Sequence, residues 1–270
     1  MKNKPSLWWN LSINPWFGCS SCSPGCIHCW AAASFWDEKA DRPLPGREDL
    51  VCRDPRFRNI RWTGQIQLNP NYDRQLAQLH CLPSGSRVAV EFMGDLFYDH
   101  PLCQDRRDHV LQLAQLHPDL VFILTTKRVH RIKDIWPGLF YDLKHRHPNI
   151  WLLASVSNQK ELINAACALS HIKAAVVGIS AEPLLEALYL REFISGLDWV
   201  ILGAERCRPF KLARRFYDRW AFQIMEDCLA AGKPLFYKYG QDETGRFCEA
   251  PVINGRFWLQ YPIITPQGGE

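Results

Sequence analysis

The chain has 270 residues, of which 47% are hydrophobic and 22% are charged, and its formal net charge at pH 7 is +4. This length and composition allow one large folded core or two modest ones, and they exclude a disordered or fibrous protein. The mild positive charge permits a nucleic-acid partner without requiring one, because dedicated nucleic-acid binders carry a denser basic surface.

The N-terminal residues give no sign of a targeting segment. Lys2 and Lys4 are not followed by an apolar stretch, and no run approaches the roughly 20 apolar residues that a membrane span requires. We therefore expect a cytoplasmic protein that does not bind membranes. Cysteines stay reduced in that compartment, and the odd total of eleven also argues against a framework of disulfides.

Short apolar runs alternate with helical patterns along most of the chain. The predicted strands lie at 8–13, 65–68, 88–93, 120–125, 151–156, 174–179, 199–202 and 235–237, and helices are predicted at 105–117, 159–169 and 217–230. Most of the strands are continuous apolar runs, which are typical of parallel strands buried on both faces.

About eight βα units indicate an α/β fold, a partial or closed (β/α) barrel of the TIM type with parallel strands. We expect one domain over residues 1–270. The alternative is an open doubly wound sheet, but no glycine-rich phosphate loop follows any strand. Residues 41–62 are rich in Arg and Pro and break the alternation, so we expect an inserted loop there that acts as a lid.

Polar residues stand at the ends of nearly all the predicted strands. The ends read NPN at 69–71, MGD at 93–95, TTKR at 125–128, SVSNQ at 155–159, SAEP at 180–183 and GAER at 203–206. In a (β/α) barrel the carboxyl ends of the strands meet at the face that carries the active site. Helix capping is the alternative explanation for a single Ser, Asn or Asp, but it does not account for Lys127, Glu182 and Glu205 together.

Four of the eleven cysteines fall in the stretch GCSSCSPGCIHCW at 18–30, with the spacing Cys19-x2-Cys22-x3-Cys26-x2-Cys29. The two Cys-x2-Cys pairs are too close together for a zinc ribbon, and this density is more typical of iron–sulfur ligation. A compact zinc site and unliganded buried thiols are the alternatives. Four thiolates would occupy all the protein-ligand positions of a cluster, whereas three would leave one iron free to bind another ligand. The loop alone does not show which of the four cysteines would not be a ligand.

The stretch WNLSINPWFGCSSCSPGCIHCWA, which starts at Trp9, resembles the three-cysteine motif of a phage- and plasmid-associated family of unknown function related to radical S-adenosylmethionine (SAM) enzymes. Further blocks are similar to that family and follow its order. The chain departs from the family pattern at Trp30, Ser157 and Ala204, where the family has Tyr, Glu and Gly. The similar blocks are FMGDLFYD (92–99), TTKRVHRI (125–132), SVSNQ (155–159), SAEPLL (180–185) and WVILGAE (199–205).

The resemblance implies a radical SAM fold and a 4Fe–4S cluster held by Cys19, Cys26 and Cys29, with Cys22 at a position that the family does not need. The amino and carboxylate groups of SAM would bind the fourth iron. Reduction would then split SAM into methionine and a 5′-deoxyadenosyl radical, which abstracts hydrogen from a substrate. An electron donor of the flavodoxin or ferredoxin type follows as a partner, and a phage-encoded protein would work in the host cell cytoplasm.

The chemistry of the strand-end residues suggests which of them bind the cofactor. We expect Asp95 or Asn69 to accept hydrogen bonds from the SAM ammonium group and Ser155 to hold a ribose hydroxyl. Glu182 is expected to bind ribose or a cationic substrate group. The alternative for Glu182 is a structural ion pair with a neighbouring Arg or Lys.

The catalytic candidates are Lys127, Arg128 and Glu205. Lys127 or Arg128 is expected to pair with the SAM carboxylate or with a substrate phosphate, although both could also be solvated residues at a strand end. Glu205 is expected to bind ribose or a cationic substrate. His28, which stands between two cysteines, is interpreted as a neighbour of the metal site and not as a ligand.

Two basic stretches with interleaved aromatic residues, at 127–133 and 208–220, suit phosphate contact and base stacking. Solvated helix faces would explain either stretch equally well. We expect DNA or a nucleotide as the substrate, with radical modification or rearrangement of a nucleobase in phage DNA as the favoured reaction. The alternatives are a radical SAM enzyme that acts on a peptide or small molecule, and a non-catalytic iron–sulfur or zinc module that binds nucleic acid.

Overall fold

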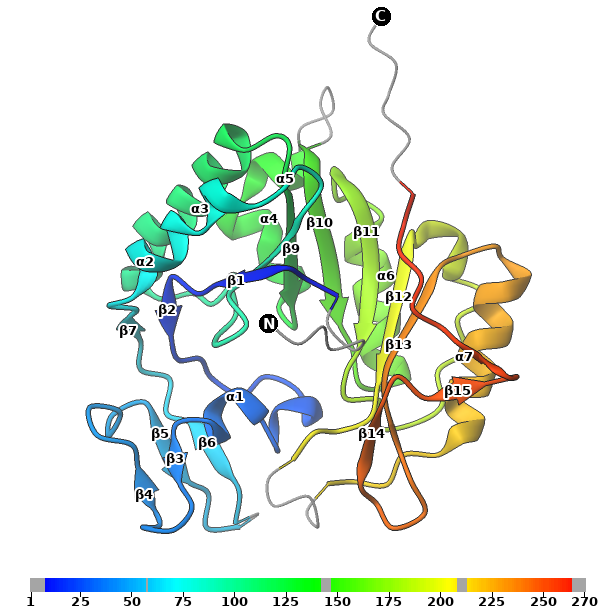
Figure 1. Cartoon of the computed structure of the whole chain (residues 1–270), viewed down its shortest axis with the longest axis horizontal. Helices are drawn as coiled ribbons and strands as arrows, with labels where there is room; N and C mark the ends of the chain where they lie inside the picture. The colour runs from blue at the N-terminus through cyan, green and yellow to red at the C-terminus, as the bar shows by residue number, and fades with distance from the viewer. Residues whose placement is uncertain (1–7, 57, 142–146, 208–212, 264–270) are drawn as a thin grey trace, which may run out of the picture.

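The computed structural model describes residues 8–56, 58–141, 147–207 and 213–263, and a curled sheet of eight strands lies at its centre (Figure 1). The strand order is β1-β8-β9-β10-β11-β12-β13-β14. All neighbours are parallel except β14, which pairs antiparallel with β13. The sheet forms a half-barrel, which confirms the predicted α/β fold with a partial TIM-like barrel.

The strands of this sheet lie close to the predicted ones. They are β1 (Leu11–Ile13), β8 (Arg87–Val90), β9 (Val121–Thr126), β10 (His147–Ser155), β11 (Ala174–Ala181), β12 (Trp199–Gly203), β13 (Leu235–Gln241) and β14 (Phe247–Glu249). A small antiparallel pair near the C-terminus consists of β15 (Val252–Ile253) and β16 (Arg256–Phe257).

The helices are α1 (Trp30–Ala33), α2 (Tyr72–Ala77), α3 (Gln104–Leu116), α4 (Ile132–Ile135), α5 (Pro137–Tyr141), α6 (Gln159–Leu169) and α7 (Asp218–Ala230). The predicted helices correspond to α3, α6 and α7. Among the described helices, none is long and apolar enough to cross a membrane.

The strand predicted at 65–68 is wrong as a member of the barrel. Only β7 (Gln67–Leu68) forms there, and it pairs antiparallel with β2 (Trp16–Phe17) outside the main sheet. Both β7 residues are exposed, whereas a parallel barrel strand is buried on both faces. The structure therefore has fewer βα units than the eight predicted.

The two faces of the sheet pack into different cores. Outward residues such as Leu124 and Leu202 pack with apolar residues of α3, α6 and α7. Inward residues, among them Trp151, Trp199 and Phe236, fill the half-barrel together with Trp8 from the segment before β1. This double burial explains why the strands are almost continuously apolar in sequence.

Three tryptophans pack against one another in the interior of the half-barrel. The Trp199 ring lies 5.8 Å from the Trp8 ring and 5.5 Å from the Trp151 ring, measured between centroids and in edge-on geometry. The Trp199 indole also donates a 2.9 Å hydrogen bond to the Gln260 carbonyl in the C-terminal segment. The segments before β1 and after β16 thus both contact Trp199 of β12. Buried apolar side chains fill the interior of the half-barrel below the strand ends.

Residues 41–62, which we expected as an inserted loop, form short paired strands together with residues 36–37 just before them. They are β3 (Trp36–Asp37) with β4 (Arg42–Pro43) and β5 (Val51–Arg53) with β6 (Ile60–Trp62). Val51 and Trp62 pair across the second hairpin and pack with Ala32 of α1. This apolar contact, which the Arg and Pro content of the segment obscures, gives the insertion its own small core beside the cysteine loop.

Candidate active site at the carboxyl ends of the strands

The inner face of the half-barrel changes from apolar to polar along each strand. On β9 the inward side chains run from Ile123 through Thr125 to Lys127, and on β13 they run from Phe236 to Lys238. Residues two apart share one face of a strand, so the sequence itself sets this change of polarity. The corresponding polar residues at the ends of β10, β11 and β12 are Ser155, Ser180, Glu182 and Glu205.

These strand ends surround a cavity of about 350 Å³ whose apolar wall is formed by Trp8, Trp9 and Phe92. A cavity at the carboxyl ends of parallel strands is where α/β barrels carry their active sites. Six of the seven residues predicted as catalytic or cofactor-binding line it. They are Asp95, Lys127, Arg128, Ser155, Glu182 and Glu205.

Asn69 is the predicted cofactor-binding residue that does not line this cavity. Its amide nitrogen donates to the Asn14 carbonyl at 2.7 Å and to Gln75 Oε1 at 3.2 Å, and its side-chain oxygen accepts from the Asn71 amide at 2.9 Å. Asn69 follows β7, which lies outside the barrel sheet. Its amide therefore holds the turn into α2 and not a ligand in the cavity.

The four clustered cysteines divide into three and one. Cys19, Cys26 and Cys29 line the cavity. Cys22 does not line it and is exposed to solvent. Across the described residues, no group of three or more His, Cys, Asp or Glu side chains is gathered tightly enough to bind a metal ion as it stands. The three thiols share one cavity without converging on a single point.

A tight turn shapes the cysteine loop. Pro24–Cys26 form a 3₁₀ turn that begins at Ser23, whose hydroxyl accepts a 3.0 Å hydrogen bond from the Gly25 amide. A Cβ atom at Gly25 would lie 2.3 Å from the buried Ser157 hydroxyl oxygen, so only glycine allows the loop to pack this closely. Ser157, where the family resemblance expects Glu, thus lies directly beneath the loop.

The three cavity thiols differ in acidity. A hydrogen bond from Cys22 and the charge of Lys127 lower the pKa of Cys26 to about 6 against the opposing effect of burial. Burial raises the pKa of Cys19 and of Cys29 above the usual range. Cys26 is therefore the most acidic of the three thiols, whereas burial favours the protonated form of Cys19 and Cys29.

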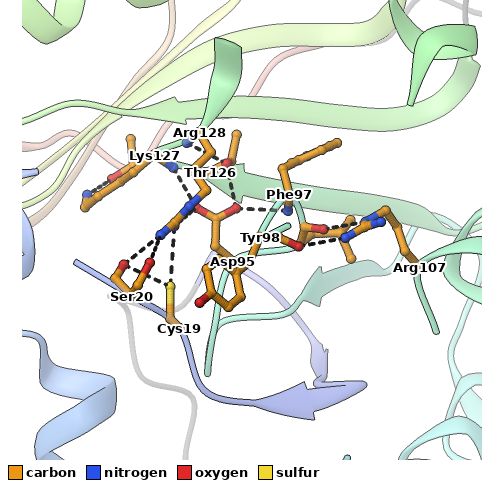
Figure 2. A network of polar contacts seen from close by, with 11 residues as sticks. Cys19, Ser20, Asp95, Phe97, Tyr98, Arg107, Thr126, Lys127 and Arg128 are labelled. Carbon is orange, nitrogen blue, oxygen red and sulfur yellow. Dashed lines mark hydrogen bonds and ion pairs between the residues drawn. The ribbon is translucent and has the colours of Figure 1, made fainter. Parts of the chain in front are cut away.

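Asp95 and Arg128 form a buried ion pair next to the loop, with Arg128 Nη1 3.1 Å from Asp95 Oδ2 (Figure 2). Asp95 Oδ1 accepts hydrogen bonds from the Thr126 hydroxyl at 2.7 Å and the Phe97 amide at 3.0 Å, and Oδ2 accepts from the Lys127 amide at 3.1 Å. Because protein donors already occupy both oxygens, Asp95 works here as a structural anchor between β8 and β9.

Arg128 also connects the ion pair with Asp95 to the first cysteine of the loop. Its Nη2 donates to the Ser20 carbonyl at 2.7 Å and the Ser20 hydroxyl at 2.9 Å, and its Nη1 lies 3.4 Å from Cys19 Sγ. The guanidinium also stacks over Tyr98, 5.0 Å from the ring centroid. Arg107 fixes that segment in turn by donating to the Tyr98 carbonyl at 2.8 Å (Figure 2). One side of the cysteine loop is thereby tied to the strand ends.

Glu205 holds the other side of the loop. His28 Nδ1 lies 2.9 Å from Glu205 Oε2, and both the Arg214 amide and its guanidinium donate to the same carboxylate. Arg214 also donates to the Pro24 carbonyl at 3.0 Å. Burial opposes ionisation, but the bonds from His28 and Arg214 prevail and lower the pKa of Glu205 to about 2. His28 thus lines the cavity next to the cysteines and is hydrogen-bonded to Glu205 through Nδ1.

The two basic stretches divide between the cavity and the surface. In the first stretch Lys127 and Arg128 face the cavity, while Arg131 pairs at 2.6 Å with Asp99 on the surface. The second begins with residues 208–212, which lie outside the described residues. Its described part contributes Arg214 to the anchor at Glu205.

Lys127, Ser155, Glu182 and Lys238 form a polar group on the wall opposite the loop. Lys127 Nζ donates to the Ser155 hydroxyl and, at 3.2 Å, to the Glu182 carbonyl. The Glu182 carboxylate pairs at 3.2 Å with Lys238 Nζ. No carboxylate in the described part of the chain pairs with Lys127, which therefore presents an uncompensated charge to the cavity.

Glu91 is a site residue that the sequence pattern concealed, because the predicted strand ran on to residue 93. It follows β8, adopts a left-handed φ of 56°, and is 1% exposed at the cavity wall. Its Oε2 accepts from the Trp16 amide at 3.2 Å, but within the described residues Oε1 has no partner. Burial, with a smaller effect from Asp95, raises its pKa well above the usual range. Strained backbone and an unpaired buried oxygen are typical of ligand sites.

Residues 5–262 match the family described as "Protein of unknown function (DUF5131)". The match covers nearly the whole chain, so the chain belongs to this family. No curated protein and no solved structure matches it. The family description states no activity, and the function has to be argued from the cavity.

Proposed function

We propose that this DUF5131 protein is a radical SAM enzyme that holds a 4Fe–4S cluster through Cys19, Cys26 and Cys29. The division of the loop thiols carries the proposal, since three line the cavity while Cys22 faces solvent. A site with three thiolates keeps one position open for a further ligand, as catalytic metal sites do. The barrel position of the cavity supports an enzymatic role.

The donors around the loop suit a group with soft thiolate ligands. Cys29 accepts hydrogen bonds from the Ala31 and Ala32 amides and the Trp62 indole, which would offset the charge of its thiolate. Arg128 does the same for Cys19. When bound, such a cluster supplies the electron that cleaves SAM reductively, and a donor of the flavodoxin or ferredoxin type would restore it.

Two residues would orient SAM by charge. The unpaired oxygen of Glu91 can accept a hydrogen bond from the SAM ammonium, and the arriving cation would favour ionisation of this carboxyl group. Lys127 can pair with the SAM carboxylate, because its ammonium has no carboxylate partner among the described residues. Glu91 replaces Asp95 in this role, since protein donors occupy both Asp95 oxygens.

The far wall of the cavity suits a nucleobase or nucleotide-linked substrate. Trp9 and Tyr239 present aromatic rings there, with Lys238 Nζ 5.5 Å and 5.1 Å from their centroids. Arg206, exposed at the edge of the cavity, stacks on Tyr239 and Phe247 and has no carboxylate partner in the described part of the chain. Aromatic rings beside cationic side chains favour planar bases and phosphates over most peptides. The resemblance to a phage-associated family favours DNA modification.

The test is anaerobic. The protein is reconstituted with iron and sulfide, reduced with dithionite, and supplied with SAM, and 5′-deoxyadenosine is quantified. The proposal expects 5′-deoxyadenosine from the wild type and from Cys22→Ala, and none from Cys26→Ala. A protein that stays colourless and produces no 5′-deoxyadenosine would overturn the proposal and leave a non-catalytic module.

A further inference from the structure

Cys22 and Cys26 form a thiol pair at the surface of the cysteine loop. The Cys22 side chain is hydrogen-bonded to Cys26. The turn between them brings the two residues together, because the Cys26 amide donates to the Ser23 carbonyl at 2.9 Å and reverses the chain. Cys22 is exposed and Cys26 is partly exposed. The pair therefore combines contact between two thiols with access from solvent.

The other two loop thiols are held away from this pair. Cys19 is 7% exposed, with its sulfur 3.4 Å from Arg128 Nη1 and 3.5 Å from the Ser20 carbonyl. Cys29 packs into the small core that Ala31, Ala32 and Trp62 form. Cys22 is thus oriented toward Cys26, while Cys19 and Cys29 are fixed in other contacts.

We propose that Cys22 and Cys26 form a reversible disulfide that removes Cys26 from the three-thiol site. The oxidant is a low-molecular-weight disulfide. One thiol of the pair, as the thiolate, attacks one sulfur of this small disulfide, which forms a mixed disulfide and releases one small thiol. The other thiol of the pair then attacks the protein sulfur of that mixed disulfide, which forms the Cys22–Cys26 bond and releases the second small thiol. The two protein thiols lose two protons and two electrons, and the small disulfide gains them.

The consequence for metal binding rests on the proposed function, whereas the disulfide itself does not. A Cys26 sulfur bonded to Cys22 is no longer a thiolate, so only two cavity thiols remain. Formation of the disulfide also protects the metal-free Cys26 from irreversible oxidation to the sulfinic acid. A reducing thiol reverses the bond and restores the site. Cys22, which the resembled family does not need, would thus regulate loading of the cofactor.

The first experiment maps the disulfide in the full metal-free chain. The reduced protein is treated with oxidised glutathione, free thiols are alkylated, and the loop peptide is sequenced by mass spectrometry. We expect a Cys22–Cys26 bond in the wild type and in Cys81→Ser, which removes an exposed cysteine elsewhere, and no loop disulfide in Cys22→Ser. A Cys19–Cys22 or Cys26–Cys29 bond, or no loop disulfide in the wild type, would overturn the pairing.

The second experiment uses Co²⁺ as a metal probe and follows the thiolate-to-cobalt absorption band. Oxidation should weaken Co²⁺ binding to the wild type by more than about 100-fold, reduction should restore it, and Cys22→Ser should bind equally in both states. Equal Co²⁺ binding by oxidised and reduced wild type would overturn the regulatory role. If the Cys22–Cys26 bond forms but the protein does not cleave SAM, the disulfide proposal is supported and the proposed function is wrong.

Discussion

Arg128 contacts Asp95 and Cys19 through the same guanidinium nitrogen, which lies 3.1 Å from the carboxylate oxygen and 3.4 Å from the thiol sulfur. A buried ion pair at the ends of β8 and β9 is thereby continuous with the first cysteine of the loop (Figure 2). Glu205 and Arg214 make the equivalent connection to Pro24 on the other side. The loop that carries the thiols is thus positioned by the barrel from both ends.

Removing the Arg128 charge should destabilise the protein strongly. In Arg128→Met the buried Asp95 carboxylate loses its cation, so we expect the free energy of unfolding to fall by about 3–5 kcal/mol. Arg128→Lys keeps a charge but not the planar fork that reaches Ser20, and should cost about 1–2 kcal/mol. Urea denaturation measures both values. Arg131→Met, which breaks a more exposed pair with Asp99, should cost less than about 1 kcal/mol. Equal losses for Arg128→Met and Arg131→Met would contradict the anchor.

The Glu205 anchor predicts a loss of stability in acid. Its pKa is lowered from 4.5 to about 2 in the folded protein, so its contribution is fully present above pH 4.5 and is lost as the pH falls toward 2. The shift corresponds to about 3 kcal/mol at neutral pH. Glu205→Gln should therefore unfold at lower urea concentration at pH 7, while the difference from the wild type narrows between pH 4.5 and 3. Glu226→Gln, on the exposed face of α7, serves as the control. A constant difference across this pH range would refute the assignment.

The raised pKa of Glu91 predicts that the stability of the protein depends on pH in the opposite direction. Its pKa is raised in the folded protein, so the unfolded chain releases this proton above pH 4.5 while the folded chain retains it, and stability falls as the pH rises. Glu91→Gln keeps the size of the side chain and removes this cost. We expect its melting temperature to exceed that of the wild type by roughly 2–4 °C at pH 7.5 and to match it at pH 4. A variant less stable than the wild type at pH 7.5 would show that Glu91 is ionised there.

The barrel was predictable because its strands are apolar on both faces, and this burial pattern leaves a direct trace in the sequence. Trp199–Gly203 is buried throughout and was predicted almost to its boundaries. The strand at 65–68 failed because a run of alternating residues suits a short strand paired outside the main sheet, such as β7 with β2, as well as a barrel strand. Pairing partners lie far apart in sequence, and local pattern does not specify them.

The position of the site was predictable from the sequence, but the contacts between its residues were not. Polar residues at strand ends identified Lys127 and Glu205 as cavity residues. Their contacts were not predictable, because Glu205 binds Arg214 and His28, which the fold brings together from separate segments. Glu91 was missed since it directly follows the apolar residues of β8 and only its backbone angle and unpaired oxygen set it apart.

Arg206 provides a test of the nucleic-acid part of the proposal. Its guanidinium lies 5.6 Å from the Phe247 ring centroid at the exposed edge of the cavity, where it can contact a phosphate beside a stacked base. Arg206→Ala should weaken binding of a single-stranded oligonucleotide about 5- to 10-fold and reduce the slope of log affinity against log salt by about 1. Fluorescence anisotropy of a labelled oligonucleotide, measured over a salt series, gives both quantities.

Arg256→Ala is the matched control for this measurement, because Arg256 also stacks on an aromatic ring, 3.7 Å from the Trp258 centroid, but does not line the cavity. It should leave the affinity within about 2-fold of the wild type and the salt slope unchanged, since an arginine remote from the bound strand releases no counterions. Equal effects of the two substitutions would mean that charge alone, and not the cavity edge, attracts the oligonucleotide. No measurable binding by the wild type would favour a peptide or small molecule as the substrate, while the thiol site and its predicted chemistry would stand unchanged.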